Sequence, residues 1–214
     1  MAESGVTAAD AVLVDLGVSS MQHDTPERGF NFRGVGPLDM RMDPSHGETA
    51  ADLLARIAVD DLTALLASYA DEPYAAPIAS ALRRAPVTTT HGLVKAVREA
   101  VAAADAAVPR AVVKMSVRRT LQALRIAIND ELTALERLLE VLPACLAPGG
   151  RVAILTFHSG EDRRVKKAFQ DGHRRGVYAS VARQVVRSTI EETRANRRAS
   201  SAKLRWAVRA RQRR

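Results

Sequence analysis

Two short and almost entirely apolar runs in the chain are each followed at once by polar side chains. Residues 11–14 lead into Asp15, and residues 152–157 lead into His158 and Ser159. An unbroken apolar run, as opposed to an alternating one, is typical of a strand that is covered on both faces, as in a parallel sheet. Because ligands of open α/β sheets bind outside the carboxyl ends of the strands, the pattern predicts a candidate site at these two strand ends.

Residues 49–108, between the two runs, show helical periodicity and no strand pattern. Thr49 followed three positions later by Asp52 resembles a capping box, and residues 88–90 predict the cap of a helix that continues to Ala103. Apolar residues recur at helical spacing at Leu53, Leu54, Ile57, Leu62, Leu65 and Leu66. We interpret this block as a helical lobe inserted into the sheet domain.

Residues 116–142 form the longest predicted helix. Its apolar stripe consists of Leu121, Leu124, Ile128, Leu132, Leu135 and Leu139. A second, polar stripe repeats at i, i+4, i+7 and i+11, which places on one helix face Arg118, Gln122, Arg125 and Asn129. These polar side chains either line a cleft or form an ordinary solvated face, and the spacing favours neither interpretation.

Residues 19–46 are predicted to be a long irregular connection, because Gly and Pro interrupt them repeatedly. Residues 38–43 alternate with period two and predict a brief extended piece. Long loops in compact domains are usually either functional or disordered. Disorder is disfavoured by four apolar side chains, Phe30, Phe32, Met40 and Met42. The loop is therefore either pinned by these residues or in contact with a substrate.

The end of the chain is predicted to complete the fold and to present positive charge. Residues 148–150 predict a tight turn before the second strand, and Ser159 with Asp162 predicts a capping box at the start of a strongly basic helix. Residues 181–186 predict a further strand. Residues 202–208 alternate apolar and basic side chains, which is the pattern of an edge strand with a basic outer face.

The 214 residues, of which 47% are hydrophobic, suffice for one core and an additional lobe. The formal net charge is +8, and the basic residues concentrate beyond Asp162. A basic end of this kind favours a polyanionic partner, most often nucleic acid, although a solubilising basic tail has the same composition. Aromatic residues make up only 4%, so binding of bases by a platform of stacked rings is not expected.

Composition also excludes several classes of site. Cys145 is the only cysteine, so neither a disulfide framework nor a cysteine zinc site is expected. The histidines lack metal-ligand spacing, and the sequence contains no P-loop or nucleophile elbow. Because no run has the length of a membrane span and no signal-peptide pattern opens the chain, a cytoplasmic location without membrane contact is expected.

Several longer motifs, in a shared order, resemble one family: the bacterial ribosomal RNA small subunit methyltransferase H family, also called MraW. They cover most of residues 10–208 and read DAVLVDLGVSSMQHDTPERGFNFRGVGPLDMRMD, TTTHGLVKAV, TLQALRIAINDEL, LAPGGRVAILTFHSGEDRRVK and NRRASSAKLRWA. The resemblance implies an α/β fold, namely a partial class I (Rossmann-like) methyltransferase sheet with an inserted helical lobe. It also implies transfer of a methyl group from S-adenosylmethionine to the N4 amine of a cytidine in 16S rRNA, with the immature 30S subunit as partner and no metal.

The resemblance further implies a division of the chain into domains. Residues 10–47 and 116–208 are expected to form the methyltransferase-like α/β domain, incomplete on its N-terminal side. Residues 48–115 are expected to form the inserted substrate-recognition lobe, and residues 209–214 a basic tail.

The candidate site residues come partly from this resemblance and partly from the residue pattern. Asp15 and Gln22 match family positions that contact S-adenosylmethionine, and a carboxylate at a strand end can pair with the ammonium group of that cofactor. The proton acceptor is unknown, with His158 and Ser159 as candidates. The RNA-binding candidates lie on the polar helix face and at the basic end of the chain: Arg118, Arg125, Asn129, Lys166, Lys167, Lys203 and Arg205.

The family carries a further N-terminal segment with a glycine-rich, GGH-type cofactor loop, which the 214-residue sequence lacks. We therefore expect a truncated methyltransferase. Two alternatives are a non-catalytic RNA-binding remnant and one half of a split methyltransferase. We also expect the 214-residue chain by itself to bind S-adenosylmethionine weakly or not at all, and to bind RNA with a steep dependence on salt.

Overall fold

A computed structural model describes residues 7–32 and 34–211 of the chain. The chain divides into two compact units. The sheet unit comprises residues 1–17 and 132–214, and the helical unit comprises residues 18–131. The helical unit is thus inserted in the sequence between two parts of the sheet unit, as the hydrophobic pattern predicts.

The sheet unit contains five strands: β1 (Ala9–Asp15), β2 (Leu146–Thr156), β3 (Tyr178–Val181), β4 (Val186–Arg187) and β5 (Lys203–Arg209). They run in the order β1-β2-β5-β3, and β4 also pairs with β5. β1 and β2 are parallel, whereas β5 is antiparallel to β2, β3 and β4. The prediction of two neighbouring parallel strands is confirmed. The prediction that both faces of these strands are covered is wrong, since Leu13 of β1 is 71% exposed.

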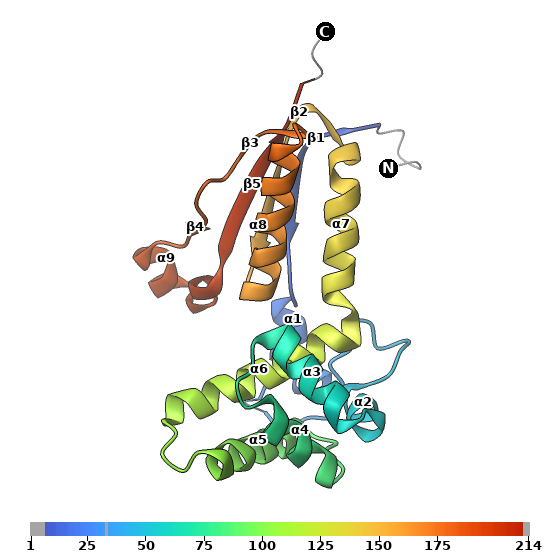
Figure 1. Cartoon of the computed structure of the whole chain (residues 1–214), viewed down its shortest axis with the longest axis vertical. Helices are drawn as coiled ribbons and strands as arrows, with labels where there is room; N and C mark the ends of the chain where they lie inside the picture. Colours follow the sequence, from blue (N-terminus) through green and yellow to red (C-terminus); the bar gives the residue numbers. More distant parts are fainter. Residues whose placement is uncertain (1–6, 33, 212–214) are drawn as a thin grey trace. The chain divides into compact units, whose positions relative to one another are not determined.

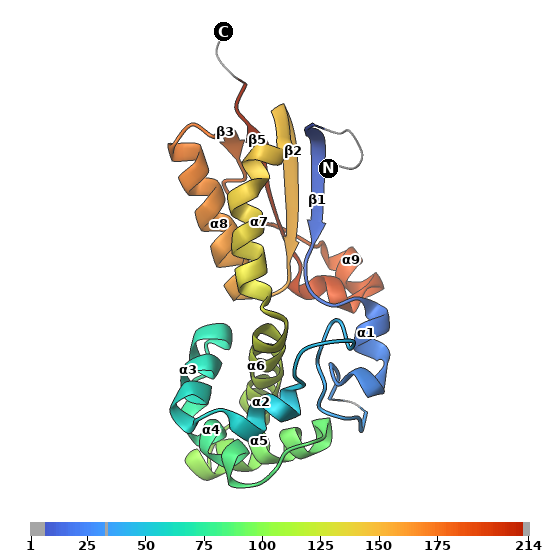
Figure 2. The same ribbon diagram turned by 90° about the vertical axis from the view of Figure 1, so that its right-hand side faces the viewer.

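Two helices, α7 (Glu131–Cys145) and α8 (Ser159–Arg174), lie on one face of this sheet (Figures 1 and 2). Their apolar side chains form a core with alternate residues of the strands. The buried members of this core are Leu135, Leu142, Leu146, Val152, Ile154, Val165, Phe169, Tyr178 and Ala207. One face of β5 is therefore covered by the helices, and the other face is open.

Three predictions for the sheet unit are wrong in detail. β5 is an interior strand and not an edge strand, because it pairs with β2 on one side and with β3 and β4 on the other. The predicted strand at residues 181–186 is not continuous, since β3 ends at Val181 and β4 begins at Val186. The predicted turn at residues 148–150 lies inside β2, where Gly149 has a positive φ of 83° and the pairing with β1 is irregular.

The helix predicted over residues 116–142 is two helices, α6 (Arg110–Asn129) and α7. They are separated at Asp130, whose φ of 48° and ψ of 36° place it in the left-handed region. Aspartate is among the residues that adopt this conformation most readily. The stripe of leucines continues on both sides of the break, so hydrophobic spacing alone does not reveal it.

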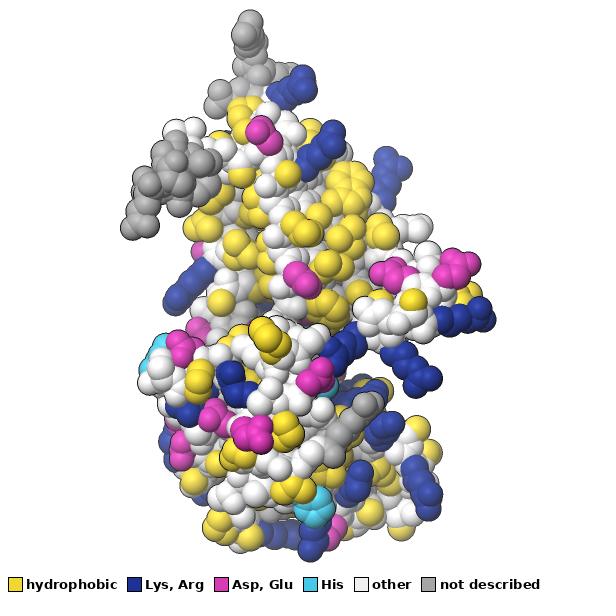
Figure 3. Space-filling model, turned by 180° about the vertical axis from the view of Figure 1, so that it is seen from behind, with side chains coloured by type: hydrophobic (Ala, Val, Ile, Leu, Met, Phe, Trp, Pro, Cys, Tyr) yellow, Lys and Arg dark blue, Asp and Glu magenta, His cyan; other side chains and the backbone are white. Residues whose placement is uncertain are grey.

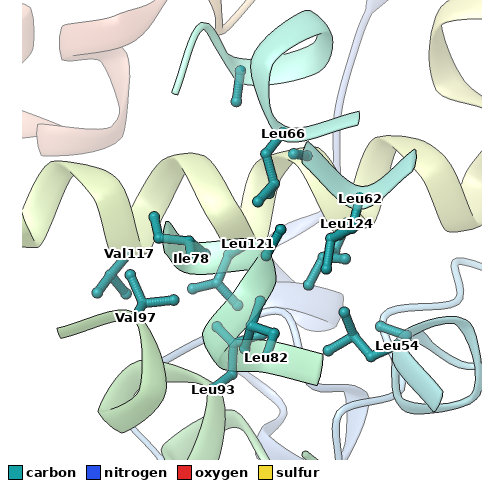
Figure 4. Close-up of a cluster of buried hydrophobic side chains, with 14 of the residues drawn as sticks. Leu54, Leu62, Leu66, Ile78, Leu82, Leu93, Val97, Val117, Leu121 and Leu124 are labelled. Atoms are coloured by element: carbon teal, nitrogen blue, oxygen red, sulfur yellow. The ribbon is translucent and has the colours of Figure 1, made fainter. Parts of the chain in front are cut away.

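The helical unit contains α1 (Ser20–Asp24), η2 (Pro26–Arg28), α2 (Ala50–Arg56), α3 (Val59–Ala70), α4 (Ala75–Arg84), α5 (Thr90–Ala104) and α6. Its core is made by side chains from four of these helices, with Leu54 of α2 beside them (Figure 4). Labelled members are Leu62, Leu66, Ile78, Leu82, Leu93, Val97, Val117, Leu121 and Leu124. The predicted capping box of Thr49 and Asp52 is confirmed, and Thr89 caps α5.

The long connection before α2 is ordered by burial. Phe30, Leu38 and Met40 belong to the same core as the helices, with exposed fractions of 8%, 1% and 1%. Arg41 hydrogen bonds to the Asp39 carboxylate and thereby lowers its pKa. The interpretation of a loop pinned by its apolar residues is supported. The predicted extended piece is absent, and Met40 has a positive φ of 64°.

The boundaries of the compact units differ from the predicted domain boundaries. They fall at residues 17/18 and 131/132, whereas the family resemblance sets domain boundaries at 47/48 and 115/116. The difference arises because the connection and the whole of α6 pack into the helical core. The functional division of the chain into domains remains a prediction.

Candidate active site

The carboxyl ends of β1 and β2 carry the predicted polar residues of the sheet unit. Asp15 is the last residue of β1 and is paired with Leu155 of β2. β2 ends one residue later, and His158 and Ser159 open the next helix. Because the two strands are parallel neighbours, these polar groups follow strand ends at the same edge of the sheet.

Asp15 is exposed and lies on the open face of the sheet. Successive side chains of a strand point to opposite faces, so Ala11, Leu13 and Asp15 share one face while Val12 and Val14 pack toward the helices. Two residues after Asp15, Gly17 has a φ of 91°, a conformation that glycine adopts without steric cost. The chain therefore turns away from the strand directly behind an accessible carboxylate.

His158 is the N-cap of α8, and this corrects the predicted capping box of Ser159 and Asp162. His158 Nδ1 accepts a hydrogen bond of 3.4 Å from the backbone N–H of Glu161. The Glu161 carboxylate accepts from the backbone N–H groups of Phe157 and His158, at 2.8 and 3.3 Å. A histidine side chain that accepts at Nδ1 occupies the place of the usual Ser or Asp cap.

The proton of neutral His158 is assigned to Nε2, since Nδ1 acts as an acceptor. Nε2 lies 3.1 Å from Glu161 Oε1, without the alignment of a hydrogen bond. The two side chains are only 9% and 4% exposed. This pair fixes the start of α8 beside the strand ends. Ser159, the first residue of α8, is exposed.

Asp162 pairs with Arg205 instead of capping α8. Arg205 Nε donates to Asp162 Oδ1 at 2.6 Å, and Nη2 donates to Oδ2 at 3.1 Å. The Arg205 side chain is 8% exposed, because it lies on the covered face of β5. The guanidinium therefore ties the first turn of α8 to the sheet, and a phosphate contact would require this ion pair to break.

Gln22 belongs to the helical unit, where its amide is engaged. Its Oε1 accepts from the backbone N–H of Ser19 in a capping box at the start of α1. Its Nε2 donates to the carbonyl of Met42 at 3.3 Å. The amide thus holds α1 against the pinned connection.

The polar stripe of α6 mostly binds other parts of the helical unit. Arg125 forms a two-bonded ion pair with Glu131, and Gln122 donates to the carbonyl of Tyr69. Asn129 donates to the Met40 carbonyl at 2.8 Å and accepts from the Met42 N–H at 2.6 Å. Arg118 is exposed. Only the structure reveals these contacts, because the partners of Asn129 are nearly ninety positions away in the sequence.

The Asn129→Ala variant is expected to lose roughly 2–4 kcal/mol of unfolding free energy, because the Met40 carbonyl and the Met42 N–H lose their partner. Urea denaturation measures this loss. Arg118→Ala, at an exposed position of the same helix face, is the control and is expected to change little. Equal midpoints for the two variants would contradict the assignment of Asn129 as the anchor of the connection.

The remaining basic candidates lie in the sheet unit. Lys166 and Lys167 are exposed on α8, and Lys203 is half-buried at the start of β5. Within the described ranges 7–32 and 34–211, none of these three lysines forms an ion pair. They are accessible to a polyanion, in contrast to Arg125 and Arg205.

The described residues provide neither a membrane span nor a metal cluster. The helices in this part of the chain include none with both the length and the hydropathy of a membrane-spanning helix. Among residues 7–32 and 34–211, there is also no group of three or more His, Cys, Asp or Glu side chains that could hold a metal ion.

The parallel pair β1 and β2, the antiparallel strand β5 beside them and the inserted helical unit define a mixed α/β protein of the Rossmann-like methyltransferase class. The predicted fold class is confirmed. The model of the MraW methylase family matches residues 1–210, and the chain belongs to this family.

Two curated relatives illustrate the similarity. The chain is 48% identical to ribosomal RNA small subunit methyltransferase H 2 of Alkaliphilus metalliredigens over 93% of the chain and 58% of the relative. It is 45% identical to ribosomal RNA small subunit methyltransferase H of Methylibium petroleiphilum, over 98% of the chain and 69% of the relative. The chain thus spans just under three fifths of the length of the Alkaliphilus protein.

Proposed function

We propose that this chain forms part of an S-adenosylmethionine-dependent methyltransferase that modifies the N4 amine of a cytidine in 16S rRNA. The observation that carries the proposal is the family match over residues 1–210, together with relatives named ribosomal RNA small subunit methyltransferase H. The proposed partner is the immature 30S subunit, and the proposed location is the cytoplasm.

The Asp15 carboxylate at the end of β1 suits the ammonium group of the cofactor. S-Adenosylmethionine carries an ammonium group and supplies the methyl group from its sulfonium. The Asp15 carboxylate is exposed at the strand end and forms no hydrogen bond within the described part of the chain, so it is available to pair with an ammonium group. A contact from Gln22 would have to replace its bond to the Met42 carbonyl or extend the capping box with Ser19.

The candidate acceptors of the proton that leaves the cytidine amine are His158 and Ser159, which follow β2. Accepting a proton at His158 requires loss of the bond from the Glu161 N–H to Nδ1, since Nε2 already carries a proton. We therefore propose that His158 positions the start of α8, while the exposed Ser159 remains the accessible polar candidate. A target cytidine has to leave the RNA stack to reach this edge.

A split methyltransferase is the second candidate, and it would account for the open face of the sheet. Leu13 is 71% exposed and Trp206 is 38% exposed. The register of the strands places both on the face opposite α7 and α8, where Figure 3 shows a continuous apolar patch. Exposed patches of this kind commonly mark a surface that another polypeptide covers. Co-expression with the remaining part of the Alkaliphilus relative, as a separate polypeptide, tests this candidate.

Analysis of the modified nucleoside tests the proposed target atom. The chain is fused to the part of the Alkaliphilus relative that lies outside the matched region and is incubated with immature small subunits and labelled S-adenosylmethionine. The rRNA is then digested to nucleosides. We expect the label in N4-methylcytidine; label in a different nucleoside would contradict the proposed target.

A further inference from the structure

We propose that residues 186–203, which comprise β4, α9 (Ile190–Ala195), η3 (Arg197–Ser201) and the first residue of β5, form a clasp for the phosphate backbone of RNA. This inference rests on the proposed rRNA substrate and adds the surface that holds it. Of this clasp segment, only Lys203 is an RNA-binding candidate from the sequence alone.

The clasp segment carries basic side chains that the fold leaves without acidic partners. Arg187, Arg194 and Arg197 are exposed, and within the described residues none of them forms an ion pair. Figure 3 shows Lys and Arg side chains projecting from the α9 region on one side, with its acidic side chains on the other. The exposed guanidinium groups are therefore available to an anion, unlike those of Arg125 and Arg205.

The pairing of β4 with β5 places two positive charges side by side. Arg187 lies directly opposite Lys203 in the antiparallel ladder. Like charges in this arrangement destabilise a sheet, and an anion bound between them would remove the repulsion.

The same segment contains a shallow pocket of about 400 Å³, whose lining begins at Ser188, the residue after Arg187. Its lining combines hydroxyl and guanidinium groups with one apolar side chain: Ser188, Thr189, Ile190, Thr193, Arg194 and Arg197. Guanidinium groups are among those that most often contact nucleic-acid phosphates. Of the three hydroxyls, only that of Thr189 is not already used as a donor within the described residues, because Ser188 donates to the Ala199 carbonyl and Thr193 bonds to Ser188. Such contacts fix the position of the RNA without reading its sequence.

The backbone of the clasp segment is held in place by its own hydrogen bonds. The Ser188 hydroxyl donates to the carbonyl of Ala199 at 2.9 Å, which links the two ends of the segment. Asn196 accepts from the Arg198 N–H at 3.1 Å and caps η3. A binding surface that is already ordered loses less conformational entropy when its ligand binds.

Binding of the 214-residue chain to a 16S rRNA transcript, measured over a series of salt concentrations, tests the clasp. The variants are Arg187→Gln and the double variant Arg194→Gln/Arg197→Gln. Arg174→Gln on α8 is the control, because it removes one charge from an exposed ion pair with Asp171 outside the segment. Thermal unfolding of every variant is measured in parallel.

We expect the double variant to bind about tenfold or more weakly and its salt slope to fall by about one unit for each phosphate that an arginine no longer neutralises. Arg187→Gln is expected to weaken binding while its melting temperature stays equal or rises, because the repulsion with Lys203 is removed. Salt-dependent binding by the wild type that neither clasp variant weakens beyond Arg174→Gln would overturn the clasp and leave the proposed function standing. Absence of rRNA binding by the wild type would overturn both.

Discussion

The Arg205→Met variant is expected to lose about 3–5 kcal/mol of unfolding free energy. Arg205 and Asp162 form a two-bonded ion pair whose side chains are 8% and 17% exposed. Removing the guanidinium leaves a carboxylate in a nearly closed site without a partner. A loss of this size is a large part of the stability of an ordinary domain, so the variant is expected to melt at a clearly lower temperature.

A double variant separates this explanation from simple loss of packing. Arg205→Met/Asp162→Leu removes both charges, and apolar replacement of a buried ion pair is often neutral or stabilising. The double variant is therefore expected to regain most of the lost stability in urea denaturation. If Arg205→Met kept the wild-type midpoint and instead lost rRNA affinity, Arg205 would be an RNA contact and not a structural one.

Asp15→Asn is expected to weaken S-adenosylmethionine binding by about 10–100-fold, the effect of losing one charge-assisted hydrogen bond. The measurement is made by calorimetry on the fusion of this chain with the remaining part of the Alkaliphilus relative. Asp15 is exposed and Asn has nearly the same shape, so the melting temperature is expected to stay unchanged.

Asp10→Asn provides the matched control for the cofactor prediction. Asp10 is an exposed carboxylate of the same strand, near its opposite end. The control is expected to bind S-adenosylmethionine as the wild type does. If Asp15→Asn also bound normally, the cofactor would not contact the end of β1, and the assignment of Asp15 would be withdrawn.

The sequence predicts elements best where one local rule decides the structure. The apolar runs before Asp15 and His158 are strands, and Thr49 caps a helix with Asp52. Local sequence rules fail where contacts with distant parts of the chain determine the structure. Alternation in residues 202–208 shows two faces, but it does not show which face α7 and α8 cover or that β2 and β3 lie on both sides.

The candidate site is predictable only in part for the same reason. Asp15 and His158 follow from strand ends, which the hydrophobic pattern locates. His158 caps α8 with Glu161 as its partner. The sequence does not distinguish this pair from Ser159 and Asp162, which have the same spacing and are the more usual capping residues. The basic residues of the last third look alike in sequence, and only the fold separates the paired Arg205 from the exposed Arg194.

A comparison of methyl transfer by two proteins shows whether this chain is part of a methyltransferase. One is the 214-residue chain, and the other is its fusion with the remaining part of the Alkaliphilus relative. Both receive labelled S-adenosylmethionine and immature small subunits. We predict that the fusion transfers the label and that the chain alone binds rRNA but transfers little or none. If neither protein transferred the label while both bound rRNA, the methyltransferase proposal would be contradicted and an RNA-binding protein would remain.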